Sequence, residues 1–342
     1  GYTVDTPLKV ARFGISSVIS LVDDTIIEQV REHHCREHGL EYTEITGSDE
    51  DSRARRIRAY LDMLDSLISI QMEEMRQQAF GLDSELDRCF EMLPDCELRQ
   101  QYFRMLEMPA GSERDGQEAM LRDSLAPGSI DVNIMTKLDR QRWENGAPVD
   151  AWYSDATTAL RGYADSTVSS TIIFSAGMNP RLFAAIADYP DFHADANGQI
   201  KKKICLKVSD YRSAWLQGMQ LARKGIWVSE YRVESGLNCG GHAFAAKGSL
   251  IGPILDEFMQ RRDELHEKLY EVYAASCEKL GRAIATVKIA ITVQGGVGTA
   301  DEHRLLKDYF KVEKVGWGTP FMLVPEAVNL DPEHMEMLCQ AD

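Results

Sequence analysis

The chain has 342 residues, 44% of them hydrophobic, so it is long enough to bury a large core. Its formal net charge of −16 comes from 54 acidic and 38 basic residues. Because phosphate backbones attract basic surfaces and anionic membranes repel acidic ones, this balance argues against nucleic acid and membrane and favours a small-molecule substrate. The seven cysteines form no CxxC pair, which argues against a bound metal and favours reduced thiols in the cytoplasm.

The first third of the chain predicts two strands, one helix and a helical block. Residues 15–22 (ISSVISLV) are strand-like, residues 24–38 have the apolar spacing of an amphipathic helix, and residues 40–45 predict a second short strand. Residues 49–128 are rich in charged residues, methionine and leucine, and apolar residues recur at helical spacing over residues 61–75. We expect two to four helices here, inserted between the second and third strands.

From residue 129 onward, strand-like runs alternate with helical patterns. The predicted strands lie in residues 129–138, 166–180, 201–210, 225–233, 287–296 and 311–320. Units in which a strand is followed by a helix indicate a parallel sheet. About eight such units favour a (β/α)8 TIM barrel built from residues 1–48 and 129–342, with a doubly wound open sheet as the alternative. In both architectures the ligand binds at the carboxyl ends of the strands.

Two glycine clusters follow the last two predicted strands. Gly295 and Gly296 precede Thr299 and Glu302, whose spacing predicts a capping box at the start of a helix. Residues 316–319 (GWGT) repeat the arrangement in the next unit. Glycines before a helix expose backbone N–H groups that suit a phosphate, and barrels often hold one after strands seven and eight. The alternative is that these glycines only form tight turns.

Several of these motifs resemble one family. Residues 294–306 (QGGVGTADEHRLL) and 314–321 (KVGWGTPF) resemble the end of FMN-binding barrels, and they are most similar to the nitronate monooxygenase (2-nitropropane dioxygenase-like) family. Residues 239–242 (CGGH) resemble the family's AGGH motif after the sixth strand, and residues 131–134 (DVNI) resemble its third-strand motif. Residues 207–226 resemble its fifth unit. The resemblance covers residues 129–138 and 166–326.

This resemblance implies a bound FMN and a role for individual residues. Asn133 and Lys207 would contact the flavin ring, with Lys137 as an alternative lysine, and His242 would act on the substrate. Cys239 replaces the family's alanine and has two interpretations, a buried filler or a thiol acting as an acid over the ring. The remaining FMN contacts would come from backbone at Gly240, Gly241, Gly295, Gly296, Gly318 and Thr319.

Three charged patterns have simpler interpretations. Glu230, Arg232 and Glu234 alternate along one predicted strand, and they form either a polar network beneath the site or a solvated strand end. The lysine run 201–203 is interpreted as a solvated strand start. The histidines of residues 33–38 (HHCREH) are assigned to a surface helix rather than to a metal site.

The functional prediction is an FMN-dependent oxidoreductase acting on a small organic substrate. One alternative is an NAD(P)H-dependent flavin barrel of the enoyl-thioester reductase type. Another is a non-catalytic barrel that binds a phosphate ligand, or a protein partner through residues 49–128. A homo-oligomer formed through the same helical block is also an expectation.

Overall fold

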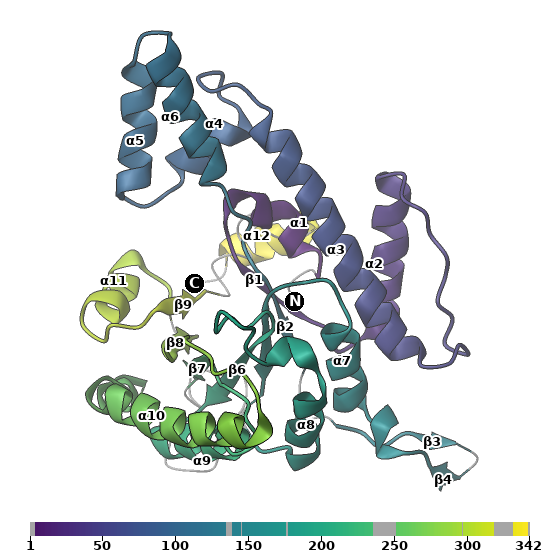
Figure 1. Ribbon diagram of the computed structural model, residues 1–342. Helices are drawn as coiled ribbons and strands as arrows, with labels where there is room; N and C mark the ends of the chain where they lie inside the picture. The colour runs from purple at the N-terminus through teal and green to yellow at the C-terminus, as the bar shows by residue number, and fades with distance from the viewer. Residues whose placement is uncertain are drawn as a thin grey trace.

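The computed structural model describes residues 4–134, 139–144, 146–175, 177–234, 251–295, 297–317 and 331–340 (Figure 1). Its α-helices are α1 (Thr6–Val10), α2 (Asp24–Glu37), α3 (Ser52–Arg76), α4 (Glu85–Glu91), α5 (Glu97–Glu107), α6 (Ser112–Asp123), α7 (Asp155–Ala164), α8 (Pro180–Ala185), α9 (Tyr211–Ala222), α10 (Ile251–Leu280), α11 (Ala300–Asp308) and α12 (Pro332–Gln340). Its strands are β1 (Ser17–Ser20), β2 (Ile130–Asn133), β3 (Trp143–Glu144), β4 (Ala147–Pro148), β5 (Thr171–Phe174), β6 (Lys203–Val208), β7 (Glu230–Val233), β8 (Ala290–Gln294) and β9 (Lys314–Gly316).

Seven parallel strands form the main sheet, in the order β1-β2-β5-β6-β7-β8-β9. Each main-sheet strand lies beside the one that precedes it along the chain, which is the winding of a (β/α) barrel. A doubly wound sheet reverses its strand order at a switch point, so that alternative is wrong for these strands. Within the described ranges no pairing joins β9 to β1. The fold is therefore a mixed α/β fold with a curved, open parallel sheet, and the prediction of a closed eight-stranded barrel is not met.

The missing predicted strand is residues 40–45, which form no strand. Side chains of α2 and α3 satisfy the backbone of this segment instead. The N–H of Ile45 donates to Glu28 at 2.9 Å, and the carbonyl of Ile45 accepts from Arg56 at 2.8 Å. The carbonyl of Thr43 accepts from Arg31 at 2.7 Å. A segment whose backbone groups are already paired in this way has no need of a neighbouring strand.

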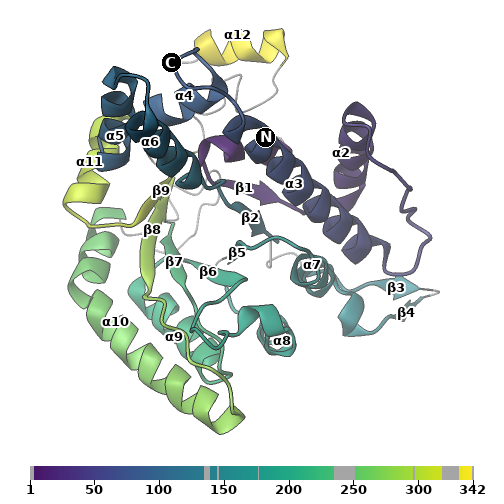
Figure 2. The ribbon, with the colours of Figure 1, turned by 45° about the horizontal axis from the view of Figure 1, so that its top comes forward.

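The helices cover the outer side of the curved sheet (Figure 2), where α7, α8, α9 and α10 follow one another. Alternate strand residues point toward them, as Ile204, Leu206 and Val208 of β6 do within the hydrophobic core. Tyr231 of β7 also faces the helices, because a Cβ on Gly218 of α9 would lie 2.1 Å from its hydroxyl. The other face, which we call the inner face, receives the intervening residues of each strand.

The helical block lies between β1 and β2, not between a second and a third strand as predicted, because residues 40–45 are not a strand. Its first helix, α3, packs against α2 and α7 and shares the main hydrophobic core. Helices α4, α5 and α6 extend away from the sheet at the far end of α3 (Figure 1). The block contains four helices, the upper limit of the two to four that the sequence predicted. The division of the chain into residues 49–128 and a separate barrel stays a prediction.

Candidate functional site

The inner face of the sheet carries a buried ionic network on three neighbouring strands. Arg232 donates to Oε1 of Glu230 through Nε at 2.9 Å and through Nη2 at 2.6 Å. The hydroxyl of Thr292 donates to the same oxygen at 2.7 Å, and Nζ of Lys314 lies 3.7 Å from Oε2. Glu230 is 3% exposed and Arg232 is 7% exposed. The solvated alternative is therefore wrong for Glu230 and Arg232, which belong to a buried polar network, and its place beneath an active site stays a prediction.

Burial alone would raise the pKa of Glu230. The Arg232 guanidinium, the Thr292 hydroxyl and Lys314 outweigh burial and hold the pKa of this carboxyl below its ordinary value. Glu230 is thus a fixed anion in the interior, and its charge is balanced by neighbours rather than by water. A network of this kind stiffens the amino-end half of the sheet, where Glu230 and Lys314 begin their strands.

Asp131 of β2 is a second buried carboxyl on the inner face, and the sequence motif drew attention only to Asn133 beside it. Its Oδ1 accepts from the N–H of Thr171 at 3.0 Å. Burial raises the pKa of Asp131, and this N–H, Lys314 and Arg232 offset only part of the effect. Asp131 was not predicted from the sequence, and the signal that could have found it is an aspartate between two apolar residues, Ile130 and Val132, of a strand-like run.

Three of the predicted cofactor contacts lie at the carboxyl ends of described strands. Asn133 ends β2, Lys207 lies near the end of β6, and Gly295 follows β8 directly. Nζ of Lys207 lies 3.5 Å from Oε2 of Glu234, and both side chains are largely buried. Gly295 has a φ of 88°, a conformation that favours glycine. One strand separates β2 from β6 and one separates β6 from β8, so these residues lie along one edge of the sheet.

The other predicted site residues lie outside the described ranges. They are Cys239, Gly240, Gly241, His242, Gly296, Gly318 and Thr319, together with the alternative lysine Lys137.

The capping box at the start of α11 is confirmed, and it alters the phosphate hypothesis. The N–H of Glu302 donates to the hydroxyl of Thr299 at 3.2 Å. Oε2 of Glu302 in turn accepts from the N–H groups of Gly298 and Thr299 at 2.9 and 3.0 Å. A carboxylate therefore already occupies two of the donors that a phosphate at this helix end would use, and it carries the same sign of charge.

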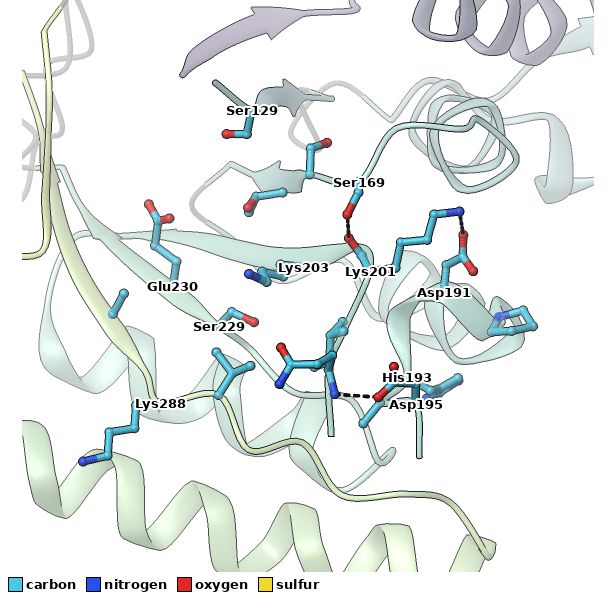
Figure 3. A pocket seen from close by; sticks show the side chains of 18 of the residues that line it. Ser129, Ser169, Asp191, His193, Asp195, Lys201, Lys203, Ser229, Glu230 and Lys288 are labelled. Carbon is cyan, nitrogen blue, oxygen red and sulfur yellow. Dashed lines mark hydrogen bonds and ion pairs between the residues drawn. The ribbon is translucent and has the colours of Figure 1, made fainter. Parts of the chain in front are cut away.

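A cavity of about 760 Å³ opens at the other edge of the sheet, at the amino ends of the strands (Figure 3). The first residues of β5, β6, β7, β8 and β9 line it, among them Lys203 and Glu230. Ser229, which is 6% exposed, has a hydroxyl with no hydrogen-bond partner. Lys203 makes no ion pair or side-chain hydrogen bond with any residue that the structure describes, whereas Lys201 pairs with Asp191 at 2.9 Å. The amino edge therefore offers uncommitted polar groups.

The lysine run 201–203 is not simply solvated, as the sequence predicted. Lys202 is 0% exposed, and its ammonium donates to the carbonyls of Tyr163 and Ser166, both at 2.6 Å. Lys201 and Lys203 both line the amino-edge cavity, whereas the Lys202 ammonium points into the interior. Only the tertiary contact with the end of α7 distinguishes Lys202 from its neighbours.

The chain thus has an α/β fold with a polar inner face and candidate sites at both edges of a parallel sheet. No protein-family model matches it, and no curated protein is significantly similar to it. Within the described ranges, none of the helices combines the length and apolar composition that crossing a bilayer requires.

Proposed function

We propose that this chain is an FMN-dependent oxidoreductase of the nitronate monooxygenase type, acting on a small organic substrate at the carboxyl edge of the sheet. Lys207 carries the proposal. It is a largely buried cation on the inner face, near the carboxyl end of a central parallel strand. The sequential winding of the seven strands supports a (β/α)8 type of architecture, in which that edge is the functional one.

The described residues offer FMN a partial fit. When bound, FMN supplies the redox chemistry of the reaction. Lys207 would hold an ammonium near the ring edge where negative charge accumulates on reduction, and Glu234 would keep that ammonium oriented. Asn133 would offer its amide from the other side of β5. Outside the described residues, His242 would accept a proton from the substrate, because imidazole titrates near neutral pH.

Glu302 is the feature that fits least well. In the proposed complex the phosphate takes its N–H donors from the Gly295 turn, and Glu302 keeps the donors of Gly298 and Thr299. Replacing the carboxylate by an amide removes the repulsion and keeps an oxygen acceptor for the cap. We therefore expect Glu302→Gln to bind FMN more tightly than the wild type, by about two- to fivefold given the usual size of helix-end charge effects.

The first experiment is a visible absorption spectrum of the purified protein, before and after addition of FMN and desalting. Retained flavin bands support the proposal, and a colourless protein that takes up no FMN contradicts it. Lys207→Met should then weaken FMN binding by about ten- to a hundredfold, the usual effect of losing a hydrogen bond to a charged group. Lys203→Met is the matched control, because it changes the same residue type on the same face of the same strand, at the opposite edge.

The electron donor is tested next, on protein loaded with FMN under anaerobic conditions. Bleaching by a nitronate or another small organic acid that is lost in His242→Ala supports the proposed reaction. Rapid bleaching by NADPH would instead favour the enoyl-thioester reductase type.

A second candidate function is the binding of a small anion at the amino edge without redox chemistry. The observation that favours it is that Lys203 and Ser229 line the same cavity. Lys203 has no partner among the described residues, and the buried hydroxyl of Ser229 has no hydrogen-bond partner. Calorimetric titration with inorganic phosphate is the test. Here Lys203→Met should abolish binding while Lys207→Met leaves it unchanged, the reverse of the FMN experiment. No heat of binding in the wild type would remove this candidate.

A further inference from the structure

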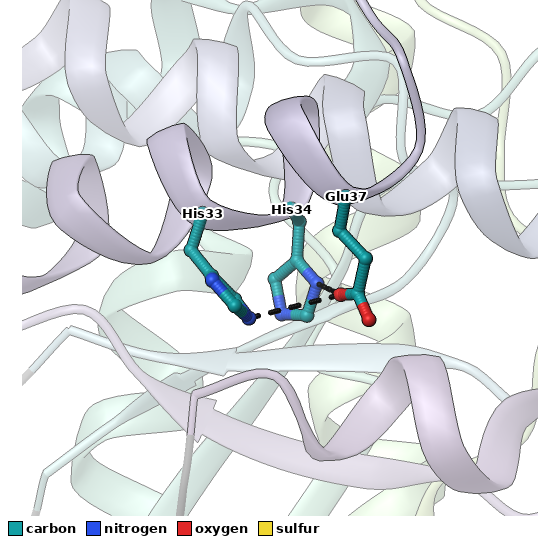
Figure 4. Close-up of side chains that lie close together, drawn as sticks. All are labelled: His33, His34 and Glu37. Carbon is teal, nitrogen blue, oxygen red and sulfur yellow. Dashed lines mark ion pairs between the residues drawn. The ribbon is translucent and has the colours of Figure 1, made fainter.

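Helix α2, whose histidines the sequence assigned to a surface helix and not to a metal site, carries three side chains of types that can bind a metal on one turn (Figure 4). They are His33, His34 and Glu37, and their nitrogen and oxygen atoms all lie within 4.8 Å of one another. Oε2 of Glu37 lies 3.3 Å from Nδ1 of His34 and 3.7 Å from Nε2 of His33. We propose that these three residues form a binding site for a divalent transition metal such as Zn²⁺.

The spacing of the atoms suits the metal. Zinc–ligand distances of about 2.0–2.2 Å in tetrahedral geometry place neighbouring ligand atoms about 3.4 Å apart. The two distances to Glu37 are already close to this value. The remaining pair of nitrogens can approach by rotation of the His33 ring, because that side chain is 71% exposed. Two imidazoles and one carboxylate leave the fourth position to water.

His34 is prepared for this role by a residue from another element. It is 8% exposed, and its Nε2 lies 3.2 Å from Oδ2 of Asp5, which precedes α1. A carboxylate that accepts from one ring nitrogen fixes the tautomer and leaves the other nitrogen free to bind a metal. That other nitrogen, Nδ1, is buried and has no hydrogen-bond partner. It faces the Glu37 oxygen, so two lone pairs meet unless a proton or a cation lies between them.

The test is calorimetric titration of the EDTA-treated full chain with ZnCl₂ at pH 7.5. His33→Gln and Glu37→Gln change exposed side chains, so both variants should fold, and each should lose one zinc equivalent or weaken its binding at least about tenfold. His38→Gln is the matched control on the same helix and should bind as the wild type does.

Zinc could also bind at cysteines, such as the exposed Cys339. All variants retain these cysteines, so a difference in binding between variants reports only on the site of α2. If neither His33→Gln nor Glu37→Gln reduces the stoichiometry or the affinity, there is no metal site on α2. The same conclusion follows if the wild type binds no zinc. Loss of binding in both variants, with wild-type binding in His38→Gln, supports the site.

Discussion

Removal of the Arg232 side chain tests how much the stability of the fold depends on compensation of the buried Glu230 charge by the inner-face network. Methionine has a similar length and no charge, so Arg232→Met removes the guanidinium while leaving little empty space. In the wild type Glu230 is 3% exposed, and after the substitution the Thr292 hydroxyl and Lys314 are its remaining polar neighbours. Because so little of Glu230 is exposed, water can restore only the solvation that its contact with the amino-edge cavity allows.

Breaking a buried ion pair by removing one partner costs about 3–5 kcal/mol, because the other charge is left uncompensated. Lys314 lies 3.7 Å from the second oxygen of Glu230, and its own side chain is mostly exposed. Because Lys314 still compensates part of the Glu230 charge, the expected loss in the free energy of unfolding is near the lower end of this range, about 3 kcal/mol. The double variant Glu230→Gln with Arg232→Met removes both charges, so it should be less destabilised than Arg232→Met alone.

The assay is urea denaturation at pH 7, followed by circular dichroism. Arg36→Met is a matched control, since Arg36 pairs with Glu32 on the surface of α2 and should cost less than about 1 kcal/mol. A loss below about 1 kcal/mol for Arg232→Met would refute the reasoning. So would a double variant whose loss equals the sum of the two single losses, because independent additivity means that the two side chains do not interact.

The pH dependence gives a second check with a definite sign. In the wild type the pKa of Glu230 is below its unfolded value of 4.5. The ionised carboxyl therefore stabilises the fold above pH 4.5, and this contribution is lost as the pH falls through the lowered pKa. In Arg232→Met, burial without the guanidinium should raise the same pKa above 4.5. The stability deficit of the variant should then shrink as the pH falls.

Three further predictions concern stability away from this network. Gly162→Ala should cost about 1–3 kcal/mol in urea denaturation, because a Cβ at this contact between α7 and α3 would lie 2.7 Å from the backbone oxygen of Ala54. Gly116→Ala in α6 is the control: a Cβ there would meet no neighbouring atom within 4 Å, so the substitution should stabilise the fold by about 0.5–1 kcal/mol. Equal effects of the two substitutions would contradict the contact at Gly162. Asp87→Asn should lower the melting temperature at pH 7, and its difference from the wild type should shrink as the pH falls below 3.8. The reason is that burial of this carboxyl is outweighed by donors that include the N–H of Gly81, which hold its pKa below 3.8. A difference that does not change with pH would show that the charge is irrelevant. Lys202→Met should cost about 2 kcal/mol in thermal unfolding, since two buried carbonyls lose their donor, and an unchanged melting temperature would show that water replaces the ammonium.

Local patterns in the sequence were sufficient for most of the secondary structure. Seven of the predicted strand regions contain main-sheet strands, although each strand is shorter than its predicted range. The helix start at Asp24 and the capping box of Thr299 with Glu302 follow the prediction. These features depend on residues within one turn or one strand, where apolar periodicity and side-chain caps act directly.

Contacts between residues far apart in sequence decided the rest. Residues 40–45 look like a strand, but Glu28, Arg31 and Arg56 take their backbone hydrogen bonds. The same kind of contact buries Lys202 against α7 and orients His34 by Asp5. Neither a hydrophobic pattern nor a charge count contains this information, because the partners are brought together only when the chain folds. The sequence therefore determined the parallel α/β class and the polarity of the inner face, and the tertiary structure decided which charges are buried, which are paired and where a cavity opens.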